Sequence, residues 1–348
     1  MAITPQKSFN IPYLQHDSYW LNLFSPEENN SSSIWDELKI IGYKKSTDGR
    51  WVAQTSTKWA ELWSRTYEIL QKAQLTEAME VVISVDSDLQ MSASGERKKA
   101  VAIQAIAENL WLGEALNEGR VMCYFQPIVG DKQKIFGFES FVRAKSLDGS
   151  IIGGDKVIRA SKALNIEHMV DRHLHVQAVQ TFAGSSCSGF LFVNFLPGFI
   201  HRPSVYLDGL SEAAKMFGIV PKHLVLELTQ AENAHDMKHL KLVYEYARTQ
   251  GYSIALDDLA TVDSAKKLIN EIRPDFVKLD TREIGTLDSI PARNTIKQIA
   301  DMIHAIGGTA IAEGVETEGA YEQLKSLGVD LFQGYHFSPP VPIDKVKM

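Results

Sequence analysis

Several short apolar segments of the sequence are each interrupted near their ends by polar side chains. The interrupting residues are Glu139, Asn194, Glu227, the pair Asp257 and Asp258, Lys278, Glu313 and Gln333. Carboxylate and amide oxygens, without histidine or cysteine, are ligands that favour Mg²⁺ or Mn²⁺ over Zn²⁺. Two such ions stabilise the attacking and leaving oxygens of a displacement at phosphorus. If the fold brings these side chains together, the pattern predicts metal-assisted hydrolysis of a phosphodiester.

Each of these residues, taken alone, also has an ordinary structural explanation. A single Asp or Glu at a strand end is typically a helix N-cap or a solvated loop residue. Lys278 could pair with Asp280, and Arg143 could be a surface charge or a bidentate clamp on a phosphate. The chain also contains three neighbouring histidines, His168, His173 and His175. They show no HExxH spacing, and helix positions i and i+2 point apart, so we do not assign them to a metal.

The elements that must position these residues follow a regular rhythm. Eight apolar or β-branched runs, each a candidate strand, begin at Val121, Ile135, Phe190, Leu224, Ser253, Asp275, Thr309 and Leu331. Amphipathic segments fill most gaps, which predicts parallel strands joined by helices and favours a (β/α)8 barrel. A doubly wound sheet is the alternative, but no GxGxxG-type loop follows any strand. In the barrel, the carboxyl ends of the strands form one face, where the polar residues would meet.

The connection between the first two of these strands is unusually short. Only residues 130–134 separate them, which is too few for a crossover helix. A connection of this length joins antiparallel strands. We therefore expect the first strand of the barrel to run against the others.

A change of composition marks two units within the 348 residues. All six tryptophans lie between Trp20 and Trp111, and we expect residues 1–92 to form a small α+β domain. It should contain a hairpin with its turn at Asp48 and Gly49, a helix over about 57–75, and the strand EVVISVD. Residues 93–348 should form the barrel domain, including a lead-in helix over about 94–118 that Gly119 ends.

Charge and hydropathy exclude several classes of protein. The net charge is −7 and no long Lys/Arg run occurs, which argues against a duplex-nucleic-acid binder. No stretch approaches the roughly 20 apolar residues of a membrane span, and the first residues lack the pattern of a secretory signal. We therefore expect a cytoplasmic protein without a membrane span. Two cysteines without CxxC spacing predict neither a disulfide framework nor a thiolate zinc site.

Taken together, these segments resemble a known family. The strand FGFESFVRA resembles the Glu-Ala-Leu signature of the EAL-domain phosphodiesterases of bacterial cyclic-di-GMP signalling. Further segments appear in the family's order over roughly residues 110–340: YFQPIV, VNFLPGF, LELTQAE, ALDD, DFVKLD, AEGVETEG and QGYHFSPP. The resemblance implies a TIM-like barrel with an antiparallel first strand. It also implies hydrolysis of cyclic-di-GMP to linear pGpG with Mg²⁺ or Mn²⁺ in a two-metal site, and a homodimer.

The resemblance also implies roles for individual residues. The positions that match metal ligands or their immediate neighbours are Glu139, Asn194, Glu227, Asp257, Asp258 and Glu316. Lys278 and Glu313 match the positions that handle the attacking water, with Asp280 supporting Lys278. The positions near substrate or the ligand shell are Gln126, Arg143 and Gln333.

The chain departs from the family pattern at three places. The signature tripeptide is Glu139-Ser140-Phe141, and Gln230 stands where the family has a Glu. After Asp258, the family's Phe-Gly-Thr-Gly is replaced by residues 259–262, Leu-Ala-Thr-Val, so both glycines are lost. Ala and Val reach glycine's backbone conformations only with strain, and a misplacement of about 1 Å can cost roughly 10²-fold in rate.

These departures leave three functions open. The first is a phosphodiesterase, which the altered loop could attenuate. The second is a catalytically silent cyclic-di-GMP receptor that signals through the N-terminal unit. The third is an adaptor that binds a protein partner through that unit. The third has the least support, because a site freed from ligand binding has no physical reason to keep costly clustered charge.

Overall fold

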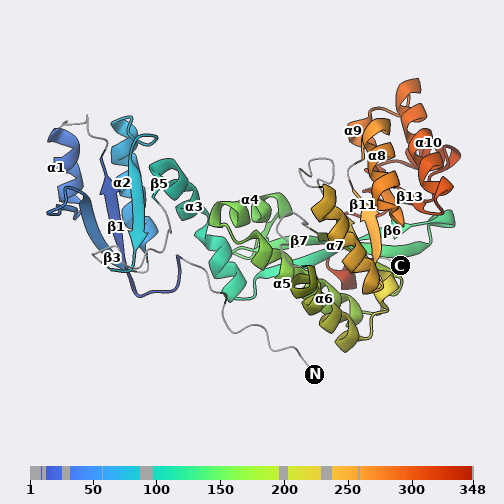
Figure 1. Ribbon diagram of the computed structural model, residues 1–348, viewed down its shortest axis with the longest axis horizontal. Coiled ribbons are helices and arrows are strands. Elements are labelled where there is room, and N and C mark those ends of the chain that lie inside the picture. The colour runs from blue at the N-terminus through green and yellow to red at the C-terminus, as the bar shows by residue number, and fades with distance from the viewer. Residues whose placement is uncertain are drawn as a thin grey trace. The chain divides into compact units, whose positions relative to one another are not determined.

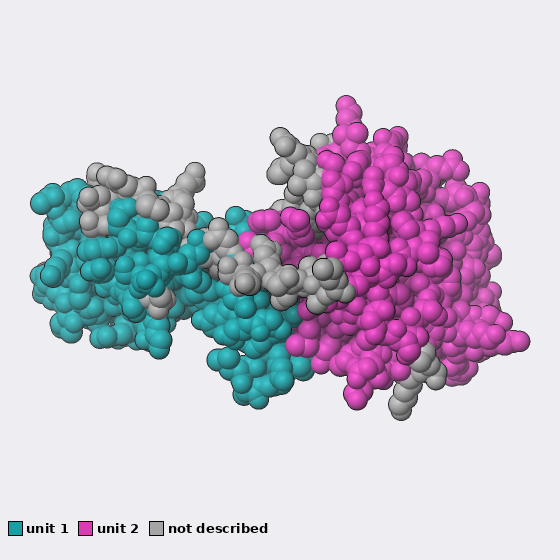
Figure 2. Space-filling view, turned by 90° about the horizontal axis from the view of Figure 1, so that it is seen from below, with its two compact units in different colours: residues 1–121, 144–167 teal, residues 122–143, 168–348 magenta. Residues whose placement is uncertain are grey.

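The computed structural model describes residues 9, 13–25, 32–56, 58–86, 97–195, 203–228, 237–257 and 259–346. The chain divides into two compact units, which Figure 2 distinguishes by colour. The first comprises Met1–Val121 with Ala144–Glu167, and the second comprises Met122–Arg143 with His168–Met348. This division follows spatial contacts, so the domain boundary expected after residue 92 stays a prediction.

The first unit contains an antiparallel five-stranded sheet with the order β2-β3-β1-β4-β5. Its elements are β1 (Ser18–Phe24), α1 (Ser32–Ile40), β2 (Lys44–Lys45), β3 (Trp51–Ser56), α2 (Trp59–Lys72), β4 (Glu80–Ser84) and β5 (Lys98–Lys99). The first six follow the βαββαβ order of a ferredoxin-like unit. Helix α3 (Ala100–Asn117) packs against α2 and against α4 (Gly154–Leu164).

Alternating burial explains how this sheet holds its helices. On β1, Tyr19, Leu21 and Leu23 are fully buried and point to one face, as the two-residue period of a strand requires. Helix α2 contacts β1 and β3, and its Trp59 and Trp63 are also fully buried. Figure 1 shows α1 and α2 beside these strands. Trp59 and Trp63 therefore belong to the core of the first unit.

The predicted hairpin and helix in this unit are confirmed, with two additions. The turn lies at Asp48 and Gly49, where Gly49 has φ +88°. The lead-in helix begins at Ala100, because the preceding residues pair with β4 as strand β5. Strand β1, the centre of the sheet, was not expected from the sequence.

The second sheet of the chain is a closed eight-stranded barrel, and all eight predicted strands are confirmed. They are β6 (Val121–Val129), β7 (Ile135–Lys145), β9 (Phe190–Phe195), β10 (Leu224–Leu228), β11 (Ser253–Leu256), β12 (Phe276–Asp280), β13 (Thr309–Glu313) and β14 (Leu331–Phe332). The order is β6-β14-β13-β12-β11-β10-β9-β7, and pairing of β6 with β7 closes the barrel. Strand β6 is antiparallel to β14, as the short connection predicted, whereas the other seven are parallel. A short strand, β8 (Ile151–Ile152), extends the sheet beside β7.

Helices follow most of the parallel strands and cover the outside of the barrel (Figure 1). They are α5 (Glu167–Ala183), α6 (Pro203–Phe217), α7 (Met237–Thr249), α8 (Val262–Ile272), α9 (Thr281–Ile284), α10 (Ile290–Ala305) and α11 (Glu318–Ser326). A large apolar cluster lies between these helices and the strands. A smaller cluster fills the barrel itself: Ile128, Phe192, Val225, Ala255, Phe276, Ile311 and Leu331.

Candidate active site

The smaller apolar cluster inside the barrel, which we call the plug, determines where the polar side chains lie. Successive residues of a strand point to opposite faces, so the residue two positions further on points inward again. On the parallel strands, two positions beyond the plug residues lie Asn194, Glu227, Asp257, Lys278, Glu313 and Gln333. On the antiparallel strand β6, the equivalent step backward from Ile128 leads to Gln126. The sequence therefore builds an apolar layer with a polar layer above it, at the carboxyl ends of the parallel strands.

Strand β7 supplies its residue of this layer beside a glycine. Glu139 follows Gly137 by two positions, and an added Cβ at Gly137 would meet the Phe190 carbonyl oxygen at 2.5 Å. Only glycine therefore allows β7 and β9 to lie this close. Each of the eight barrel strands thus contributes one polar side chain at the same end of the barrel.

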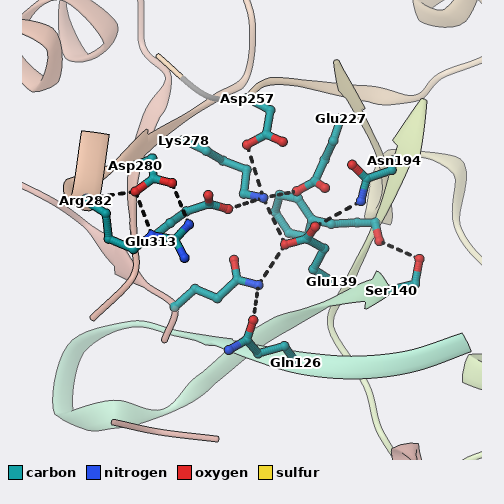
Figure 3. A network of polar contacts seen from close by, with 12 residues as sticks. Gln126, Glu139, Ser140, Asn194, Glu227, Asp257, Lys278, Asp280, Arg282 and Glu313 are labelled. Carbon is teal, nitrogen blue, oxygen red and sulfur yellow. Dashed lines mark hydrogen bonds and ion pairs between the residues drawn. The ribbon is translucent and has the colours of Figure 1, made fainter. Parts of the chain in front are cut away.

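Lys278 lies at the centre of this layer. Its Nζ is 2.9 Å from Glu139 Oε2, 3.0 Å from Glu227 Oε1 and 3.5 Å from Asp257 Oδ1. It also forms a close ion pair with Glu313. The Lys278 side chain is only 1% exposed. Figure 3 shows the four carboxylates turned toward this one ammonium group.

Amide side chains fix the Glu139 carboxylate from its other sides. Asn194 Nδ2 donates to Glu139 Oε1 at 3.0 Å, and Gln333 Nε2 donates to Oε2 at 2.7 Å. Gln333 Nε2 also lies 3.1 Å from Gln126 Oε1, and Gln126 donates to the Ser338 carbonyl. Glu139 is therefore held by three donors, counting Lys278.

The electrostatics of the cluster are those of buried like charges. Burial, and then Glu139 and the other carboxylates, raise the pKa of Glu227 well above its ordinary value. Burial likewise raises the pKa of Glu313 to about 8, although Lys278 opposes this. Burial lowers the pKa of Lys278, but the four carboxylates outweigh it and raise that pKa. Four ionised carboxylates would carry more negative charge than one ammonium neutralises, so Glu227 and Glu313 tend to keep a proton.

The predicted residues Asp280 and Glu316 lie beside the cluster. Asp280 is buried, caps α9 by accepting from the Arg282 backbone N–H at 2.8 Å, and receives the Arg282 guanidinium at 3.0 Å. This contact, together with Glu313 and Glu316, raises the pKa of Arg282. Glu316 itself is exposed in the loop after β13. Arg282 was not singled out from the sequence, since an exposed Arg after a strand carries no distinctive signal.

The predicted phosphate clamp, Arg143, lies on β7 four residues beyond Glu139. Its Nη1 donates to the Val142 carbonyl at 2.7 Å, and its guanidinium lies 5.7 Å from the centre of the Tyr124 ring. Both side chains are half-buried. Arg143 therefore rests on an aromatic ring, and its described contacts do not join it to the carboxylates.

The altered loop after β11 forms a regular helix start. The Thr261 hydroxyl caps α8 by accepting from the Ser264 N–H at 3.3 Å, and Leu259 is fully buried. Neither Ala260 nor Val262 has a positive φ. The chain therefore takes a course that needs no glycine at these positions. Asp258 and Gln230 lie outside the described residues.

One histidine that we did not assign to a metal nevertheless touches the site. The His175 ring is buried on α5, and its Nε2 lies 2.6 Å from the Asn194 carbonyl oxygen. A carbonyl only accepts, so Nε2 carries a hydrogen and donates. The ring also stacks on Phe195 and lies 3.6 Å from Asp171. Only the tertiary structure reveals this contact, because 19 residues separate the two groups.

The donor set fits a hard divalent cation in type. All candidate ligands offer oxygen, and Glu227 Oε2 is buried with no hydrogen-bond partner within the described part of the chain. In the same described ranges, no three His, Cys, Asp or Glu side chains form a ready metal-binding group. The Lys278 ammonium lies where the carboxylates converge. The residues therefore suit such an ion provided that the ammonium moves.

The comparison with protein families agrees with this architecture. A model described as the EAL domain matches residues 110–340, which is well over half of the chain. This protein therefore belongs to the EAL domain family.

No helix in the described ranges is both long and apolar enough to cross a membrane.

Individual relatives share less than a third of their aligned residues with this chain. The chain is 27% identical over 251 residues to "Probable cyclic di-GMP phosphodiesterase PdeI" of Escherichia coli K12, covering 69% of this chain. It spans only 32% of that longer protein. A standalone versatile EAL protein from Vibrio cholerae O395, solved in its c-di-GMP-bound form, aligns with TM-score 0.55 and 27% identity over 64% of this chain and 92% of that one. The Bacillus subtilis YkuI protein, in complex with c-di-GMP and calcium, shares the fold with TM-score 0.56 and 23% identity, covering 65% and 57%.

Proposed function

We propose that this barrel hydrolyses a phosphodiester bond of cyclic-di-GMP to give linear pGpG, with Mg²⁺ or Mn²⁺ bound among its carboxylates. The observation that carries the proposal is the convergence of four carboxylates from four strands on one point of an EAL-family barrel. The printed names and titles of the relatives, which include cyclic-di-GMP phosphodiesterases and c-di-GMP complexes, support the choice of substrate.

We assign the roles within the site as follows. The groups that would hold two ions are Glu139, Asn194, Glu227, Asp257, Asp258 and Glu316. Ions held there would supply positive charge against the developing charge on phosphorus and lower the pKa of an attacking water. Lys278 would orient that water, and Glu313, which forms a close ion pair with Lys278, would accept the proton of the water.

The remaining residues would position substrate and ligands. Arg143 would clamp a phosphate with its paired N–H donors once it leaves its contact with Val142. Gln126 and Gln333 would orient Glu139 through the hydrogen bonds described above. Asp280 would support Lys278 through the backbone, because it fixes the end of β12 by capping α9.

A second candidate function is a silent cyclic-di-GMP receptor. Two observations favour it: the ammonium of Lys278 lies at the point of convergence, and the loop after β11 follows a course without glycine. A site that keeps its phosphate-binding groups but resists ions would bind the nucleotide without cutting it.

One experiment separates these functions. The purified chain is incubated with cyclic-di-GMP and either Mn²⁺, Mg²⁺ or a chelator, and pGpG is quantified by chromatography beside a Glu139→Ala variant. We expect pGpG only from the wild-type chain with a divalent ion. Micromolar binding by calorimetry without turnover would select the receptor. If the chain showed no binding and no turnover, both functions would be refuted.

We also propose the organisation of the whole chain. Residues 1–92 would form a sensory or interaction domain that binds a protein partner, and residues 93–348 the catalytic domain, acting as a homodimer in the cytoplasm. The five-stranded ferredoxin-like sheet and the closed barrel share no strand, which supports two domains. Limited proteolysis should release two stable fragments, and light scattering after gel filtration should give the mass of a dimer.

A further inference from the structure

The position of Lys278 has a consequence for ion binding that goes beyond its assigned role with water. Its ammonium is within 3.5 Å of carboxylate oxygens from β7, β10, β13 and the end of β11. Each of these carboxylates except Glu313 is also a proposed ion ligand. Lys278 therefore occupies the place where a cation would gain most from the same oxygens.

The ammonium satisfies these partners only in part. It has three N–H donors for four carboxylates, so at least one contact is an ion pair without its own hydrogen bond. The longest is to Asp257, at 3.5 Å. Glu227 Oε2 has no hydrogen-bond partner within the described residues. A single positive charge thus holds the cluster together but leaves it short of both charge and donors.

We propose that the Lys278 ammonium is an internal substitute for a divalent cation: it holds the carboxylates together without an ion and must be displaced before they can bind one. This inference rests on the proposed function, which supplies the ion. The ammonium and the ion compete for one set of oxygens, because Glu139, Glu227 and Asp257, which contact the ammonium, are also the proposed ligands of the ion. In the wild-type chain, ion binding must supply the free energy needed to break the ammonium contacts, which lowers the affinity for the ion. Lys278 therefore sets the ion concentration at which the site becomes active.

The competition makes an unusual prediction for Lys278→Met. Methionine is an unbranched apolar side chain of similar length, so the variant removes the charge while filling the space. Without ions, the four carboxylates, three of which are buried, lose the one cation described among them, and the variant should unfold at a lower temperature than the wild type. With ions, it should bind Mn²⁺ at least about tenfold more tightly, and Mn²⁺ should raise its melting temperature more.

The test is calorimetric titration of the chelator-treated full chain with MnCl₂ alone, repeated with MgCl₂, and thermal unfolding with and without each ion. The matched control is Lys325→Met, which removes a surface lysine paired with Asp131 on the same unit. It should bind Mn²⁺ with wild-type affinity. A Lys278→Met affinity equal to or weaker than that of the wild type overturns the proposal.

Failure of the variant to fold without ions does not remove the test. In that case, Mn²⁺ should restore its circular-dichroism spectrum and NaCl of equal ionic strength should not, and Lys278→Gln supplies the affinity ratio. If Mn²⁺ did not restore the spectrum, the proposal that the ammonium substitutes for an ion would be contradicted. The readout is independent of turnover: absence of pGpG from the wild type refutes the proposed hydrolysis, whereas the ratio of ion affinities alone decides the competition.

Discussion

The two compact units bury polar side chains in different ways. In the first unit, the fully buried Asn22 donates to the Val82 carbonyl at 3.3 Å and to Ser84 Oγ at 3.0 Å. Its oxygen accepts from Arg50 at 2.8 Å, and Arg50 pairs with the exposed Asp48. The barrel instead surrounds one buried lysine with four carboxylates.

The difference distinguishes groups that specify a fold from groups that bind something. Hydrogen-bonded neutral groups are inexpensive to bury, whereas ions lose a large hydration energy that pairing rarely recovers in full. Asn22 shows that the sheet of the first unit can bury a polar side chain whose groups are matched to partners. The unbalanced charge in the barrel is the opposite case, and the proposed divalent cation would account for it.

The largest expected effect is on catalysis, through Glu313→Gln. Glutamine keeps the size and an oxygen for Lys278 but cannot accept a proton from water. We expect turnover of cyclic-di-GMP with saturating Mn²⁺ to fall by about 10²- to 10⁴-fold. Glu318→Gln, at an exposed carboxylate in the same region of sequence, should stay within about twofold of the wild type. Equal activity of the two variants would remove Glu313 from the chemistry.

The next effect concerns pH and sharpens the contrast between the units. The pKa of Glu313 is about 8 in the folded protein against an ordinary 4.5, so the folded chain keeps a proton that the unfolded chain releases. Without ions, the free energy of unfolding of the barrel should therefore fall between pH 4.5 and 8, by up to about 5 kcal/mol. The raised pKa of Glu227 acts in the same direction.

Urea unfolding in a chelator at several pH values tests this dependence. Tryptophan fluorescence reports the first unit, because all six tryptophans precede residue 112, and circular dichroism reports both units. Glu313→Gln should flatten the pH dependence of the barrel transition. A barrel whose stability rises with pH over this window would contradict the raised pKa.

A smaller effect is expected in the first unit from Asn22→Ala. The change leaves the Ser84 hydroxyl and one Arg50 donor without their partner in a buried place, at a cost of about 1–2 kcal/mol. The loss should appear in the unfolding transition followed by tryptophan fluorescence. Calorimetric Mn²⁺ affinity of the barrel should not change. An altered Mn²⁺ affinity would show that the units do not bury their polar groups independently.

The smallest effect is expected from His175→Phe. Phenylalanine keeps the ring on Phe195 but loses the N–H donated to the Asn194 carbonyl, a hydrogen bond worth about 1 kcal/mol. Mn²⁺ affinity should weaken about fivefold, with partial recovery in His175→Gln, whose amide can donate. If both variants bind Mn²⁺ like the wild type, His175 only packs.

The barrel was predictable because two simple signals agree along the chain. Each buried parallel strand is a nearly unbroken apolar run, and each ends in a polar residue two positions after a plug residue, as with Phe276 and Lys278. The hairpin of β6 and β7 was predictable from the length of its connection alone. Strand β1 was missed, because its sequence, SYWLNLF, is short and interrupted by the polar Asn22.

Contacts between distant segments were not predictable in the same way. Sequence reasoning offered Asp280 as a simple partner for Lys278, yet the described contacts of Lys278 run to four other strands, and Asp280 accepts from Arg282. The contact between His175 and Asn194 likewise depends on how α5 lies against β9. Such distances depend on barrel stagger and helix packing, which no local pattern encodes.

By itself, the sequence determined the eight strands, the direction of the first and the types of side chain at their ends, because periodicity and connection length are local properties. Only the tertiary structure decided that one ammonium lies among four carboxylates and that the amides of Asn194 and Gln333 donate to Glu139. Closing a barrel brings residues nearly 200 positions apart to within hydrogen-bonding distance. Their protonation then depends on burial and on the neighbouring charges, and not on residue type alone.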